Sequence, residues 1–140
     1  IGAITRLHDM GIEPFLLSSS LLAVMSQRLV RLLCTDCREA YEPSDAELEM
    51  LDMAGEHGVT VYRAKGCENC NYTGYRGRTG IYELIEIDDP MRIMIHEGAG
   101  EQVMLQLARQ QYPGIEADGR RRILSGETSI KEVLRVTSVA

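Results

Sequence analysis

Four cysteines are the residues in this sequence best suited to chemistry. They form two pairs, each with two residues between its members, and 29 residues separate the pairs: Cys34, Cys37, Cys67 and Cys70. Two such turns can build a tetrahedral cage of four thiolates, which suits zinc at about 2.3 Å from each sulfur. Two disulfides or four unrelated buried thiols are the alternatives. No export signal is seen, so we expect a reducing compartment and predict one zinc site that holds a subdomain together.

Charge and hydropathy limit the classes to which the sequence can belong. The 140-residue chain has a net charge of −6, and the segment from the first to the last cysteine holds nine acidic and three basic side chains. A zinc module that binds nucleic acid should be basic, so we expect no nucleic-acid partner. No run of about 18 apolar residues is present to cross a membrane. The chain begins at Ile1, within a helical pattern and without Met, so we expect a fragment of a longer protein.

Two arginines, Arg76 and Arg78, are further candidates for a chemical role. They lie in a glycine-rich segment, 71–80, which is predicted to be a loop. The metal would hold one end of this loop, and a strand over residues 81–87, apolar on both faces and therefore buried, would hold the other. Arginines fixed in this way suit contact with phosphate, and surface ion pairing is the alternative.

Familiar catalytic motifs are missing from the sequence. Neither of the two lysines, Lys65 and Lys131, follows the glycines of a phosphate-binding loop, and no Ser/His/Asp or H-E-x-x-H pattern occurs. The histidines are isolated and are interpreted as surface or packed residues: His8, His57 and His96. We therefore expect no catalytic residue in this chain.

Hydrophobic periodicity and capping signals predict an α+β fold. Helices are expected over residues 1–10, 15–30, 44–54, 89–97, 101–111, 118–124 and from 129 onward. Strands are expected over residues 59–63 and 81–87, and residues 27–33 either close the second helix or form a short strand. Ser44 with Glu47, and Ser129 with Glu132, match the capping-box pattern, and Leu134 is expected to face inward in the last helix.

Three stretches of the sequence resemble one known family. They are residues 6–21, residues 27–31 leading into the first cysteine pair, and residues 74–84. Together they are similar to the secretion ATPases of type II secretion systems, the general secretory pathway protein E family. Type IV pilus assembly ATPases share the cysteines and the glycine–arginine segment but differ over residues 15–21, so the resemblance favours the secretion branch.

The resemblance implies a hexameric cytoplasmic motor, peripheral at the inner membrane, whose ATP hydrolysis drives pseudopilus assembly and protein export. The implied partners are the other subunits of a homohexamer and inner-membrane platform proteins, which would make membrane association indirect. Zinc is the cofactor implied for this chain. ATP and magnesium would bind only in the full-length protein, because the nucleotide-binding motifs would lie upstream of Ile1. Arg78 matches an arginine linked to ATPase activity, whereas Arg76 is expected to be structural.

The resemblance also implies a division of the chain into four parts. Residues 1–33 would be the tail of a RecA-like ATPase domain, and residues 34–72 the tetracysteine zinc-binding subdomain. Residues 73–88 would return to the ATPase sheet, and residues 89–140 would form a C-terminal helical bundle. The fragment alone is expected to be inactive. A zinc-organised protein-interaction module is the alternative from a different functional class.

Overall fold

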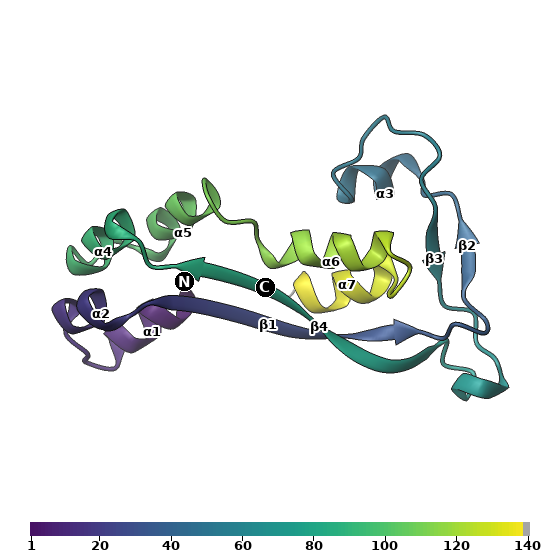
Figure 1. The fold of residues 1–140 in the computed structure, drawn as a ribbon, viewed down its shortest axis with the longest axis horizontal. Coiled ribbons are helices and arrows are strands. Elements are labelled where there is room, and N and C mark those ends of the chain that lie inside the picture. The colour runs from purple at the N-terminus through teal and green to yellow at the C-terminus, as the bar shows by residue number, and fades with distance from the viewer. Residues whose placement is uncertain (139–140) are drawn as a thin grey trace. The chain divides into compact units, whose positions relative to one another are not determined.

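The structure, a computed structural model, describes residues 1–138 and mixes helices with strands (Figure 1), which confirms the α+β class. The helices are α1 (Gly2–Asp9), α2 (Pro14–Ser20), α3 (Asp45–Met50), α4 (Asp89–His96), α5 (Glu101–Arg109), α6 (Ile115–Leu124) and α7 (Ile130–Thr137). The strands are β1 (Ala23–Leu33), β2 (Glu39–Tyr41), β3 (Val61–Arg63) and β4 (Tyr75–Glu86), and a 3-10 turn, η1, covers Glu68–Cys70. Among these residues no helix has the length and apolar character needed to cross a membrane.

The chain forms two compact units, each built from segments that are distant in sequence. The first unit combines Ile1–Ser26 with Glu83–Gly114, and the second combines Gln27–Tyr82 with the chain from Ile115 onward. Strand β1 pairs with β4 in one two-stranded sheet, and β2 pairs with β3 in another. The division into an ATPase-domain tail (1–33), a zinc-binding subdomain (34–72), a return segment (73–88) and a helical bundle (89–140) remains a prediction. Residues 139–140 lie outside the described residues.

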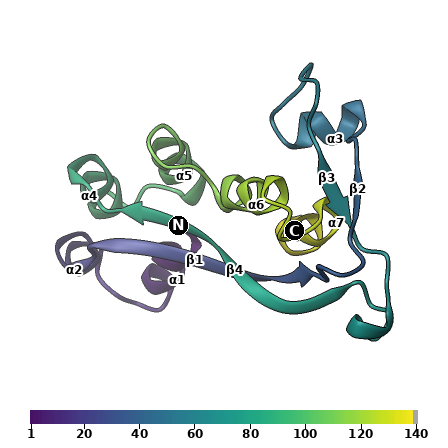
Figure 2. The ribbon, with the colours of Figure 1, turned by 45° about the vertical axis from the view of Figure 1, so that its right-hand side comes forward.

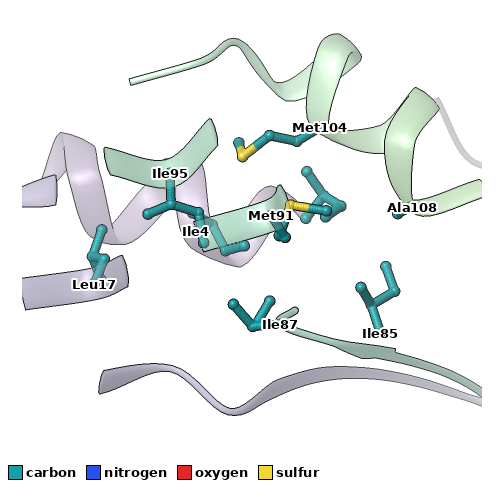
Figure 3. Close-up of a cluster of buried hydrophobic side chains, with 9 residues drawn as sticks. Ile4, Leu17, Ile85, Ile87, Met91, Ile95, Met104 and Ala108 are labelled. Carbon is teal, nitrogen blue, oxygen red and sulfur yellow. The ribbon is translucent and has the colours of Figure 1, made fainter. Parts of the chain in front are cut away.

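The first unit is organised around one apolar core (Figure 3). The side chains that form it are all buried: Ile1, Ile4, Leu17, Ile85, Ile87, Met91, Ile95, Met104 and Ala108. Helix α2 packs against α4, and Arg92 of α4 donates a hydrogen bond to the carbonyl oxygen of Ser18 at 2.5 Å. Asp88 caps α4 by accepting from the backbone N–H of Met91 at 3.0 Å, which confirms the helix start predicted there.

The predicted helix over residues 15–30 is wrong. Helix α2 ends at Ser20, where Ser18 and Ser19 donate their hydroxyls back to the carbonyl oxygen of Phe15. The chain then continues as the eleven-residue strand β1, because β4 offers its backbone N–H and C=O groups as partners. Only some apolar residues of this strand, such as Val24, Val30 and Leu32, follow a period of two, so pairing with a distant strand decided the outcome.

The predicted loop over residues 71–80 is wrong from residue 75 onward, since β4 begins at Tyr75 and includes both arginines, whereas residues 71–74 form a turn as predicted. Gly77 produced the loop signal, and its φ of +83° is accommodated within the strand. The strand over residues 81–87 was expected to be buried on both faces, and this expectation is wrong. Ile81 and Ile85 are buried, whereas Tyr82 and Leu84 are 41% and 52% exposed, because a two-stranded sheet is covered on one side only.

The second unit has its own core, in which α6 lies beside α7 (Figure 2). Its buried residues are Val30, Leu51, Val61, Ile81, Ile115, Ile123, Ile130 and Val133. Close approach of the two helices depends on Gly119, because a Cβ atom at this position would lie 2.6 Å from Cγ1 of Val133. Strands β2 and β3 form an antiparallel pair with Glu39 opposite Arg63.

The two predicted capping boxes have different outcomes. At the start of α3, Ser44 and Glu47 exchange both expected hydrogen bonds, which confirms the prediction. At the start of α7, Ser129 accepts from the backbone N–H of Glu132 at 3.1 Å, but the carboxylate of Glu132 turns to other partners. The prediction that Leu134 faces inward is wrong, since this side chain is 38% exposed.

Candidate metal centre and its surroundings

The four cysteines come together as the sequence predicts. Their sulfur atoms all lie within 4.8 Å of one another, and three of the Sγ–Sγ distances are 3.8 Å: Cys34–Cys67, Cys37–Cys70 and Cys67–Cys70. A tetrahedron with metal–sulfur bonds of about 2.3 Å has edges of about 3.8 Å. These separations far exceed the disulfide bond length of about 2.05 Å, and all four cysteines are free. The cluster can therefore hold one metal ion.

Two turns present the sulfurs. Cys34 follows β1 directly, and its carbonyl oxygen accepts from the backbone N–H of Arg38 at 3.0 Å, which closes the first turn around Cys37. The second pair lies in the 3-10 turn η1. The two turns are tied together by a hydrogen bond of 2.9 Å from the backbone N–H of Cys34 to the carbonyl oxygen of Gly74. Local backbone geometry thus preforms the site.

Backbone N–H groups also tune the sulfurs. The N–H groups of Cys67 and Gly74 each donate to Sγ of Cys70 at 3.2 Å. Burial acts to raise the pKa of the Cys70 thiol, but these hydrogen bonds outweigh it and lower the pKa to about 6. Burial and the neighbouring thiols raise the pKa of Cys37 to about 12. The hydrogen bonds from Cys67 and Gly74 therefore favour the thiolate form of Cys70, which is the form that binds a metal ion.

A buried carboxylate that the sequence analysis missed lies beside the end of β1, which leads into the first cysteine pair. The side chain of Glu132 has no exposed surface, and its Oε2 accepts from Nε of Arg31 at 2.5 Å. Its other oxygen accepts from Nε of Arg135. Burial opposes ionisation of Glu132, but the hydrogen bonds from the two arginines lower its pKa. The carboxylate is therefore charged, paired and fixed between β1 and α7.

Further contacts join the same segments. The guanidinium of Arg31 lies over the ring of Tyr75 with its Cζ 4.2 Å from the ring centroid, and the Tyr75 hydroxyl is 2.6 Å from Oγ of Ser129. The buried Thr128 donates its hydroxyl to the carbonyl oxygen of Arg31 at 2.8 Å. Arg38 donates to the carbonyl oxygen of Gly126 at 2.6 Å. The turn between α6 and α7 is thus fastened to the residues that carry the first cysteine pair.

The candidate arginines lie apart from this network. Arg76 and Arg78 are both exposed on β4. Within residues 1–138 neither side chain forms an ion pair or a hydrogen bond. Both are consequently available for a partner that this chain does not itself contain.

Comparison with known proteins gives consistent matches over almost the whole chain. A family model described as "Type II/IV secretion system protein" matches residues 1–135. The chain is 56% identical over 137 residues to the type II secretion system protein E of Pseudomonas aeruginosa and 55% identical to that of Aeromonas hydrophila. It is 52% identical to the type II secretion system ATPase E of Vibrio cholerae. Each match covers 98% of this chain but only 27% of the relative.

Proposed function

Because the chain belongs to the family of type II/IV secretion system proteins, we propose that it is the C-terminal part of a secretion ATPase. The observation that carries this proposal is identity above half with proteins named type II secretion system protein E, over 98% of the chain. The names of these relatives favour the secretion branch over the pilus-assembly alternative. They also disfavour a stand-alone interaction module. The four-cysteine cluster lies in the second compact unit.

In this proposal the whole protein is a homohexamer that hydrolyses ATP to drive pseudopilus assembly and protein export. The relatives are longer than this chain, so ATP and magnesium would be bound by residues outside it. The motor would be cytoplasmic and would reach the inner membrane through platform proteins. An acidic chain with a net charge of −6 supports protein partners rather than nucleic acid.

We assign zinc to the cysteine cluster. Four thiolates at tetrahedral spacing suit this ion, and a site closed by four protein ligands leaves no position for substrate. The role of zinc would therefore be structural: bound to Cys34, Cys37, Cys67 and Cys70, it would contribute folding free energy to the segment between the pairs. The single ion per chain is tested by elemental analysis of protein purified without chelator.

Arg78 is proposed to contact nucleotide phosphate in the assembled motor, whereas the structural ion pairs expected of Arg76 are not formed within residues 1–138. The support is that Arg78 is an exposed arginine without an ion-pair partner in residues 1–138, on a strand whose start adjoins the metal centre. A fixed cation can stabilise charge on a transferring phosphoryl group by factors of about 10³–10⁵ in rate. Its position on a strand satisfies the need for a side chain placed before the reaction.

The proposed function is tested on the full-length protein. ATP hydrolysis should be measured for the parent, for Arg78→Ala and for Arg76→Ala as the matched control, together with zinc content and melting temperature. We expect Arg78→Ala to lower kcat by about 10³-fold or more, the range known for such arginines, with unchanged zinc content and stability. Full activity of Arg78→Ala, or loss of zinc from it, would remove the assignment. A full-length protein without ATPase activity would remove the proposed function itself.

A further inference from the structure

The second compact unit contains a groove to which the proposed function assigns no role. Its volume is about 620 Å³, within the range of ligand-binding pockets, and it lies between the β2–β3 pair, α3 and the start of α7. Three cations line it: Arg31, Arg63 and Lys131. Glu47 is the acidic residue in the lining, so the groove is positive although the chain as a whole carries −6.

The cations of the groove are available to a ligand. Arg63 and Lys131 are exposed, and neither forms an ion pair within the part of the chain that the structure describes. Arg31 uses its Nε for Glu132 and keeps 45% of its side-chain surface exposed. Glu47 already accepts from the hydroxyl of Tyr41 at 2.6 Å and from the backbone N–H of Ser44. Glu132 on Arg31 and Glu47 near Arg63 offset part of this charge, but three cations against one carboxylate leave the lining with a net positive charge.

The two guanidinium groups are held in place before any ligand arrives. Cζ of Arg63 lies 4.4 Å from the ring centroid of Tyr41, and Cζ of Arg31 lies 4.2 Å from that of Tyr75. Each tyrosine is itself fixed through its hydroxyl, one by Glu47 and the other by Ser129. Stacked arginines lose little conformational entropy on binding an anion and present a planar set of donors that fits a carboxylate or a phosphate.

The neutral polar groups in the lining are occupied. Besides the two tyrosine hydroxyls, Thr73 donates to backbone oxygens, and Ser129 is engaged with Tyr75 and the start of α7. The rest of the lining is apolar, and Met50 and Leu134 remain 43% and 38% exposed. The groove consequently offers cations and aliphatic surface, with few free groups to recognise a base or a sugar.

We propose that this groove binds a peptide segment of a partner protein in which carboxylate side chains alternate with aliphatic ones. The carboxylates would contact Arg63 and Lys131, and an aliphatic side chain would cover Met50 and Leu134. A nucleotide is disfavoured because its base and ribose would find no free neutral partners.

The test uses the zinc-loaded 140-residue chain and a short fluorescein-labelled peptide in which Glu and Leu alternate. Fluorescence anisotropy gives the Kd, and amide chemical-shift mapping locates the peptide on the 15.6 kDa chain. Arg63→Gln and Lys131→Gln should each weaken binding by about tenfold or more, the effect of losing one charge-assisted hydrogen bond. Arg6→Gln, an exposed arginine in the other compact unit, is the matched control and should leave the Kd unchanged.

Two altered peptides make the test specific. Replacing Glu by Gln should abolish binding, and replacing Leu by Ser should weaken it. The proposal is overturned by absence of saturable binding or by equal weakening in Arg6→Gln. It is equally overturned if inorganic triphosphate or phosphatidylglycerol vesicles bind more tightly than the peptide and displace it. Lys131→Gln keeps the test valid if loss of the Arg63 stack disturbs the fold.

Discussion

Replacing Glu132 by glutamine should destabilise the second compact unit by about 2 kcal/mol. The change removes a fully buried charge that accepts from Arg31 and Arg135, each such charge-assisted bond being worth about 1.5–3 kcal/mol. The full loss is discounted because the two arginine side chains are 45% and 55% exposed and regain hydration. For a chain of this size about 2 kcal/mol corresponds to a lower melting temperature by about 8 °C.

The effect of pH follows from the lowered pKa of Glu132. Its hydrogen bonds with Arg135 and Arg31 keep the folded-state pKa below the unfolded value of about 4.3. The paired carboxylate therefore contributes stability above about pH 4.3, and this contribution is lost as the pH falls through the folded-state pKa. The stability difference between parent and Glu132→Gln should be constant near neutrality and shrink in acid. Using the difference cancels the effect of releasing the proposed zinc, which would be common to both proteins.

Urea denaturation followed by circular dichroism measures the free energy of unfolding for the parent, Glu132→Gln and the control Glu116→Gln. Glu116 is an exposed acid on α6 and should cost less than about 0.5 kcal/mol. A double-mutant cycle with Arg31→Gln should give a coupling energy of about 1 kcal/mol or more. If Glu132→Gln is no more costly than Glu116→Gln, or if the coupling is absent, the buried ion pair does not stabilise this unit.

Three further results are expected. Cys37→Ser should abolish stoichiometric zinc, seen by elemental analysis, and loosen the segment between the cysteine pairs; unchanged zinc content would refute the four-thiolate site. Gly119→Ala should cost about 1–3 kcal/mol in urea denaturation because its Cβ meets Val133, and it should cost little in a Val133→Ala background; equal costs in both backgrounds would refute the close contact. Removing zinc with a chelator should raise the rate of amide hydrogen exchange in α7 but not in α4. Protection of α7 that does not depend on zinc would show that the metal-binding turns do not hold this helix.

Features encoded by neighbouring residues could be predicted from the sequence. The spacing of the cysteines predicted that their sulfurs cluster, the Ser44–Glu47 pattern predicted the start of α3, and Asp89–Pro90 predicted the start of α4. The failures concern β1 and β4, whose strand character depends on pairing between segments about fifty residues apart. Periodicity alone could not distinguish an apolar run that forms a helix from one that finds a strand partner.

Glu132 shows why a prediction from neighbouring residues alone assigned the wrong role to a buried side chain. Its position three residues after Ser129 matches a capping box, and the backbone half of that motif is present. The carboxylate nevertheless leaves its local role because Arg31, 101 residues away, lies against the start of α7 and provides a stronger, charge-assisted bond. That placement follows from β1 continuing into the first cysteine turn. Residues 31–38 therefore carry both the first cysteine pair and the arginine that binds Glu132, so the position of α7 depends on this one stretch of chain.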